Sequence, residues 1–174
     1  MDPQVIDIPQ AVRDLAPAPE EFWEWGTRAG HGWSAWKKFD QDEFVGIVHR
    51  HCELHDDENI PQFIKEIDVW DEDTMLSGFV GDNLESNSSL GWHVDTYQVY
   101  GFNIEGETAW EYFSLRSGKI ETIELGEMDK MIFMPCGVTH QVKVLSEYRT
   151  SLSLVQRGEL SGMKLPFKRH EWID

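Results

Sequence analysis

Alternating hydrophobic and polar positions dominate the second half of the chain. Segments with this period-two pattern, separated by turns, cover residues 90–104, 109–115, 120–125, 131–134, 138–145 and 149–155. Six or seven short strands at this spacing are typical of a β-sandwich or barrel. The apolar run over 75–80 predicts one more strand, and Ser117-Gly118 predicts a hairpin turn. We therefore expect a mainly β core over residues 74–156.

The first 73 residues show a different pattern, which predicts a helical layer. Prolines at positions 3, 9, 17 and 19 predict an extended arm over 1–19. A helix is expected over 20–29, and another over 41–56, where Phe44, Val48 and Cys52 recur every four residues after a capping box of Asp40 and Glu43. Pro61 opens a third, short helix. Residues 82–89 predict a polar loop, and 157–174 a C-terminal tail.

Length and charge limit the class of protein. The 174 residues fit one domain, and no linker divides them, so we expect 1–174 to fold as a unit. The net charge is −17, and the first 90 residues hold 20 acidic and 6 basic side chains. Such a negative field argues against a nucleic acid or an anionic membrane as partner. No apolar run reaches transmembrane length, no signal peptide is evident, and two cysteines give no disulfide framework, so a cytoplasmic protein is expected.

Three side chains in the β half have the chemistry of a metal site. His93 and Asp95 are two residues apart, so they share one face of a strand. His140 follows the turn Pro135-Cys136-Gly137 at the start of a later strand. Two imidazoles and one carboxylate can occupy one face of an octahedral ion and leave adjacent positions open, as in the facial triad of Fe(II) oxygenases. The pattern predicts His93, Asp95 and His140 as ligands of Fe(II).

The segments around these ligands resemble a known family. The motif H-x-D, followed by P-x-G-x-x-H with its histidine 45 residues after the aspartate, is similar to that of double-stranded β-helix oxygenases, in particular their cupin-like JmjC branch. The resemblance covers roughly residues 76–156. It implies a mainly β, double-stranded β-helix (cupin or jelly-roll) fold. It also implies Fe(II), 2-oxoglutarate as cosubstrate, and O₂. Ordinary cupins differ in using three histidines and a glutamate, whereas this chain has Asp95.

The resemblance also indicates residues for the cosubstrate. JmjC enzymes commonly carry a basic residue on the strand after H-x-D, but this chain has none between Asp95 and Arg116, and the matching position is Thr108. Other 2-oxoglutarate oxygenases use R-x-S or R-x-T after the last histidine, which is similar to Arg149-Thr150-Ser151 here. We assign Arg149 to the distal carboxylate and Ser151 as a hydroxyl donor. Tyr97, Asn103 and Thr108 are expected to be supporting donors.

Together these features predict an Fe(II)- and 2-oxoglutarate-dependent oxygenase, with a small molecule, peptide or protein as the substrate to be hydroxylated. The oligomeric state stays open, with a homodimer as one alternative. Two other functions stay open: a metal-dependent cupin enzyme that uses no 2-oxoglutarate, and a cupin-like module that binds a ligand without catalysis. The missing basic residue after Asp95 supports the first of these.

Each of these residues also has a simpler interpretation. The three ligands would otherwise be polar residues on a strand surface, and Arg149 a surface or salt-bridge arginine. The nearby aromatic residues would be core or sheet-face aromatics, namely Trp92, Tyr97, Tyr100 and Trp110. A rival zinc site would use His51 and His55, four residues apart on the helix expected over 41–56, with His49 and Cys52 nearby. A solvated helix face is the preferred interpretation of that segment.

Overall fold

The structure is a computed structural model that describes residues 1–19, 21, 34–40, 43–54, 61–71, 74–82 and 91–157. Strands make up most of this part of the chain, and its helices are short. In chain order the elements are β1 (Gln4–Asp7), α1 (Gln10–Arg13), β2 (Ser34–Asp40), β3 (Glu43–Leu54), α3 (Gln62–Lys65), β4 (Met75–Asp82), β5 (His93–Val94), β6 (Tyr97–Glu105), β7 (Thr108–Ser114), β8 (Lys119–Leu125), β9 (Lys130–Met134), β10 (Thr139–Val144) and β11 (Tyr148–Arg157).

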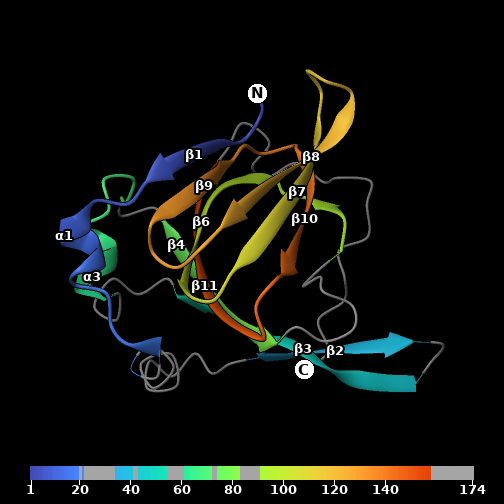
Figure 1. The fold of residues 1–174 in the computed structure, drawn as a ribbon, viewed down its shortest axis with the longest axis horizontal. Helices are drawn as coiled ribbons and strands as arrows, with labels where there is room; N and C mark the ends of the chain where they lie inside the picture. The colour runs from blue at the N-terminus through green and yellow to red at the C-terminus, as the bar shows by residue number, and fades with distance from the viewer. Residues whose placement is uncertain are drawn as a thin grey trace.

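The strands form two facing antiparallel sheets. The larger sheet has the order β1-β9-β6-β11-β4-β3-β2, and the smaller has the order β5-β10-β7-β8. From β4 onward the chain passes back and forth between the sheets: β4, β6, β9 and β11 lie in the larger sheet, and β5, the hairpin β7–β8 and β10 lie in the smaller one (Figure 1). This winding is the double-stranded β-helix that the sequence predicts, and it confirms the mainly β fold class.

Side chains alternate between two cores. Between the sheets lies an apolar cluster with members from both of them: Val99, Trp110, Tyr112, Leu125, Ile132 and Met134. On the outer face of the larger sheet, Leu152 and Leu154 of β11 are fully buried against side chains of α1 and α3, including Val12 and Ile64. Figure 1 shows the two short helices beside each other on this side of the barrel. The period-two pattern of β11 arises because its two faces enter different cores.

The helix predicted over 41–56 is wrong. This segment contains the strand β3, which pairs with β2 on one side and with β4 on the other. A spacing of four residues between Phe44, Val48 and Cys52 fits one face of a helix, but it also fits one face of a strand, where every second residue shares a face. The β-branched residues Val45 and Ile47 favour the strand. The rival zinc site loses its helical premise, because His49, His51 and Cys52 lie in β3, while His55 lies outside the described residues.

The expected extended arm over 1–19 contains regular structure. The strand β1 pairs with β9, and the helix α1 follows Pro9 directly. Pro3 and Pro9 precede these elements instead of preventing them, because a proline is tolerated at the first residue of an element. Helices are a minor part of the layer predicted over 1–73, since β1, β2 and β3 also come from it.

The short helix after Pro61 is confirmed as α3, with Phe63 and Ile64 buried. The helix predicted over 20–29 and the loop over 82–89 lie, except for Glu21 and Asp82, outside the described residues, as does the C-terminal tail beyond Arg157. In the described residues, no helix has the length and apolar character needed to cross a membrane.

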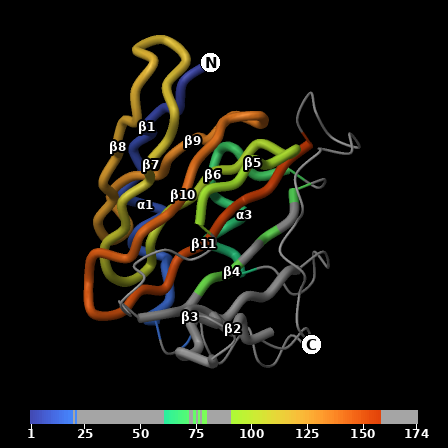
Figure 2. The backbone as a smooth tube through the Cα atoms, turned by 90° about the vertical axis from the view of Figure 1, so that its right-hand side faces the viewer, coloured from blue at the N-terminus to red at the C-terminus, as the bar shows by residue number. Residues whose placement is uncertain are grey.

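The predicted hairpin at Ser117-Gly118 joins β7 to β8. Figure 2 shows this hairpin extending beyond the rest of the barrel, with the N-terminus of the chain beside it. Gly118 has φ +68°, and a Cβ atom built there would meet nothing within 4 Å. Gly106, with φ +76°, is different, because a Cβ there would collide with the Tyr148 carbonyl oxygen and the Ser146 hydroxyl.

Gly106 and Gly118 form a matched pair for testing the packing of the β6–β7 turn, because both have positive φ and only Gly106 lacks room for a Cβ atom. Gly106→Ala is expected to lower the free energy of unfolding by about 3 kcal/mol, because left-handed backbone strain adds to overpacking. Gly118→Ala carries the strain without the collision, so about 1 kcal/mol is expected. Urea unfolding followed by tryptophan fluorescence measures both. Equal losses in the two variants would show that the packing around Gly106 contributes nothing.

Candidate metal centre

Two neighbouring strands bring the predicted ligands together. His93 in β5 and His140 in β10 are directly opposed in the antiparallel register. Asp95 follows β5, and its carbonyl oxygen accepts a hydrogen bond of 2.9 Å from the amide of Gly137, in the turn before β10. The backbone therefore ties the loop that carries Asp95 to the turn that leads to His140.

The ligand atoms of the three residues converge. The Oδ2 atom of Asp95 lies 3.8 Å from Nε2 of His93 and 3.6 Å from Nε2 of His140. All three ligand atoms lie within 4.8 Å of one another. The His93 and His140 rings have centroids 4.3 Å apart. The structure thus places the three predicted ligands around one point.

Backbone carbonyls select the tautomer of both histidines. Nδ1 of His93 lies 2.8 Å from the Gly91 carbonyl oxygen, and Nδ1 of His140 lies 3.0 Å from that of Val138. A carbonyl oxygen only accepts, so each Nδ1 carries the proton and each Nε2 has its lone pair free. This is the arrangement that orients a metal-ligating histidine. Two imidazole nitrogens and a carboxylate oxygen are a donor set that fits Fe(II) and other divalent transition metals.

Burial differs among the three ligands. The side chain of His140 is 2% exposed, that of His93 is 21% exposed and that of Asp95 is 36% exposed. The cluster is thus buried on the His140 side and open on the Asp95 side. Burial lowers the pKa of His140 below its ordinary value, and the neighbouring His93 lowers it further, while Asp95 opposes the shift. His140 is therefore neutral near pH 7, as a metal ligand must be.

Acid is expected to destabilise the metal-free protein through His140. As the pH falls through the ordinary pKa of 6.5, the unfolded chain takes up a proton that folded His140, with its lowered pKa, does not accept. The free energy of unfolding should then fall with falling pH until the pH is below the folded pKa. Denaturation in a chelating buffer, from about pH 7.5 to 5, measures this for the wild type and for His140→Gln. The wild type should lose more stability over this range, and equal slopes would contradict the prediction.

The residues assigned to the cosubstrate lie on the inner faces of the barrel. Ser151 of β11 is opposite Asn103 of β6. Nδ2 of Asn103 donates to Oγ1 of Thr108 at 3.1 Å, which joins the two sheets across the interior, and to the Leu125 carbonyl at 2.9 Å. Asn103, Thr108 and Ser151 are all buried. Tyr97 lies at the other end of β6 and is half-buried.

Arg149 is a buried cation at the same end of β11 as Ser151. It is 3% exposed, and its guanidinium carbon lies 5.7 Å from the centre of the Phe79 ring. Alternation along β11 puts Arg149 on the face that carries Ser151, towards the interior. Burial lowers its pKa to about 10, which leaves the side chain protonated at neutral pH. The structure thus places one permanent positive charge beside the polar patch formed by Asn103, Thr108 and Ser151.

Two interior residues were missed by the sequence reasoning. Ser153, which follows Ser151 on the same face of β11, is buried opposite Gly101. Trp110 was expected to be a core aromatic, but its ring also stacks on His140, with centroids 5.9 Å apart and an interplanar angle of 17°. Gly101 in β6 is a sequence signal that another group approaches this strand closely, because a glycine inside a strand often marks such a place, but it does not identify the contact with His140.

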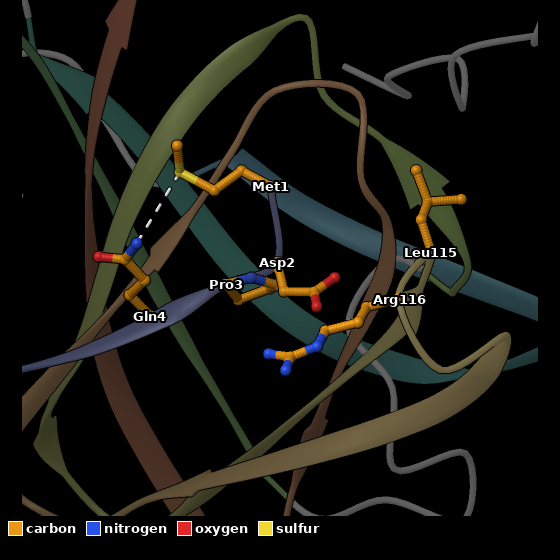
Figure 3. A pocket seen from close by; sticks show the side chains of 6 residues that line it. All are labelled: Met1, Asp2, Pro3, Gln4, Leu115 and Arg116. Atoms are coloured by element: carbon orange, nitrogen blue, oxygen red, sulfur yellow. Dashed lines mark hydrogen bonds between the residues drawn. The ribbon is translucent and has the colours of Figure 1, made fainter.

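A separate cavity of about 630 Å³ opens between the N-terminus and the β7–β8 hairpin (Figure 3). Its lining comes from residues 1–4 and from Leu115 and Arg116. None of the predicted site residues lines it. It is therefore not the cosubstrate site that the sequence predicts.

The fold and the His-Asp-His cluster define a cupin-fold protein with a candidate metal site. No family model matches the sequence, and no curated protein matches it. Two solved structures of YcfD, a ribosomal oxygenase from Escherichia coli, cover 90% of this chain, at 14% and 15% identity and TM-scores of 0.62 and 0.60. Hazelnut (Corylus avellana) vicilin covers 75% at 13% identity, with a TM-score of 0.50. This chain spans 48% of YcfD and 32% of vicilin, and at such identities the likeness shows the fold.

Proposed function

We propose that the chain is an Fe(II)- and 2-oxoglutarate-dependent oxygenase that hydroxylates a protein side chain or a small molecule. The observation that carries this proposal is the convergence of Nε2 of His93, Nε2 of His140 and Oδ2 of Asp95, with both Nδ1 atoms committed to backbone carbonyls. Three protein ligands on one side of an ion leave adjacent positions for a cosubstrate and O₂. The fold likeness to a ribosomal oxygenase supports the same class of reaction.

In this proposal the protein residues bind the metal and orient the cosubstrate. His93, Asp95 and His140 would hold the metal. Bound Fe(II) would supply O₂ activation, while 2-oxoglutarate supplies two electrons as it is oxidised to succinate and CO₂. The buried side of the cluster, at His140, excludes water, and the more exposed side, at Asp95, leaves access for the substrate. The net charge of −17 favours a basic peptide or protein as that substrate.

Arg149 is proposed to bind the distal carboxylate of 2-oxoglutarate. A buried guanidinium can pair with a carboxylate through two parallel hydrogen bonds, and low exposure strengthens such a pair. Ser151 would donate its hydroxyl to the same carboxylate. Asn103 and Thr108 bond to each other and to the backbone, so in this proposal they act by holding the two walls of the pocket at a fixed spacing.

A metal-dependent cupin enzyme that does not use 2-oxoglutarate is the second candidate. It is favoured by Thr108, which stands where JmjC enzymes commonly carry a basic residue and whose hydroxyl already bonds to Asn103. Under this alternative, Arg149 is a structural cation packed against Phe79. The two candidates agree on the metal centre and differ on the cosubstrate, so a ligand titration separates them.

The deciding experiment is an anaerobic thermal-shift titration followed by an assay for succinate. Mn(II) alone should raise the melting temperature, and 2-oxoglutarate should raise it further only when Mn(II) is present. Glutarate, which has both carboxylates but no 2-oxo group, is the matched control and should add much less. With Fe(II) and air, slow succinate formation is then expected without substrate. Stabilisation by metal with no response to 2-oxoglutarate would favour the second candidate, and no response to metal would refute both.

A further inference from the structure

We infer that Trp110 is a positioning residue for His140, and that Gly101 is glycine to leave room for it. This inference rests on the proposed metal centre, because it gives a residue outside the three ligands a role in orienting one of them. It depends on two contacts of a single indole ring. One contact is with a ligand of the centre and the other is with the opposite sheet.

The first contact is the stacking of Trp110 on His140. The two rings are within 17° of parallel, with centroids 5.9 Å apart. Both residues are buried, with 7% of Trp110 and 2% of His140 exposed. Trp110 is opposite Val142, the residue two positions after His140 on the inner face of β10. The indole therefore lies beside the imidazole on the same wall of the barrel.

The second contact is with β6 in the facing sheet. A Cβ atom built on Gly101 would collide with Cζ2 of the indole and lie 2.7 Å from Cη2. Real Cβ atoms do not come this close to another heavy atom, so any other residue at position 101 must push the indole away. The backbone of Gly101 is not in the left-handed region, since the positive-φ glycines in the described residues are 91, 106, 118 and 137. Position 101 therefore requires glycine because the indole leaves no room for a Cβ atom, and not because of the backbone conformation.

Together the two contacts hold the indole between a strand backbone and a ligand ring. The imidazole of His140 is fixed at Nδ1 by the Val138 carbonyl, but one hydrogen bond still allows the ring to rock. The Trp110 indole cannot move away, because the backbone of Gly101 lies against it. Stacking on this indole therefore prevents the rotation of the His140 imidazole. Nε2 is then held towards Asp95, 3.6 Å away. Outer contacts of this kind usually change metal affinity by 10- to 100-fold when they are lost.

The test combines two readouts on Gly101→Ala and on the double variant Gly101→Ala/Trp110→Phe. Long-range ¹H–¹⁵N spectra of the metal-free protein report the tautomer of His140, and Mn(II) titration reports affinity. Gly101→Ala should give a mixture of tautomers and weaken Mn(II) binding by at least 10-fold. The double variant should restore the Nδ1–H tautomer and bring the affinity back to within about threefold, because the new methyl group fills the space of the outer ring atoms that phenylalanine lacks.

Leu125→Ala is the matched control. Leu125 belongs to the same buried cluster as Trp110, so the variant should lose stability and keep both the tautomer and the Mn(II) affinity of the wild type. If Gly101→Ala does not fold, Trp110→Phe alone is expected to mix the tautomers and weaken Mn(II) binding severalfold. The inference is overturned if Gly101→Ala, or in its place Trp110→Phe, keeps the wild-type tautomer, or if Leu125→Ala changes it equally. Absence of Mn(II) binding in the wild type would refute the metal centre, while the tautomer data would still decide the role of Trp110.

Discussion

Asp95→Ala is expected to weaken Mn(II) binding about 1,000-fold and to abolish turnover. Asp95 is the one carboxylate among the three clustered residues, and its Oδ2 atom lies within 4 Å of Nε2 of His93 and of Nε2 of His140. Without it, two neutral imidazoles remain, and these bind a divalent ion much more weakly. A 1,000-fold loss corresponds to about 4 kcal/mol. Calorimetric titration with Mn(II) under nitrogen measures the affinity, and succinate formation in air measures turnover.

Glu107→Ala is the control for the Asp95 variant. Glu107 is an exposed carboxylate in the turn before β7, so its removal changes the net charge of the protein equally without touching the cluster. In both variants, the circular dichroism spectrum and the melting temperature of the metal-free protein should stay close to those of the wild type. Near-equal Mn(II) affinities in Asp95→Ala and the wild type would rule out Asp95 as a ligand.

Arg149→Met should raise the 2-oxoglutarate concentration needed for half-maximal stabilisation by about 100-fold, or about 2.7 kcal/mol. Methionine fills most of the volume of the arginine stem but has no charge to pair with the distal carboxylate. Methionine is apolar and suits a buried position, and the melting temperature of the metal-free variant checks that it is folded. Its affinity for Mn(II) should not change, because Arg149 is not among the clustered ligands.

Arg149→Lys refines this prediction. Lysine keeps the positive charge but loses the planar pair of donors, so an intermediate loss is expected. The measurement is a thermal-shift titration with 2-oxoglutarate at saturating Mn(II), with Gly118→Ala as a folded reference. A 2-oxoglutarate response in Arg149→Met like that of the wild type would assign the carboxylate to another residue. Parallel loss of Mn(II) binding would show that Arg149 supports the fold instead.

The sequence predicted the strands after residue 90 well because one face of each meets the interior and the pattern is strict. In β11, leucines at 152 and 154 alternate with serines at 151 and 153, and the two sets enter different environments. The same reasoning failed over 43–54, because apolar residues four apart satisfy both a helix and a strand. The short elements β1 and α1 were missed because four residues give too few positions to show a period.

The candidate ligands could be predicted because their chemistry is local. His93 and Asp95 are adjacent on one strand face, and the turn before His140 is recognisable from proline and glycine. The stacking of Trp110 on His140 could not be predicted in this way, since alternation says that an aromatic residue points inwards but not which side chain it meets. The bond from Asn103 to Thr108 was also hidden, because it joins opposite sheets.

The shortness of β5 has a kinetic consequence. This strand has two residues, lies at the edge of the smaller sheet and pairs only with β10 within that sheet. Segments with so few backbone hydrogen bonds open far more often than the whole protein unfolds. Exchange of an ion held by His93 would therefore proceed through local opening of β5, with the rest of the barrel intact. Binding of the ion would in turn slow amide hydrogen exchange in residues 91–95 far more than in β6 or β11.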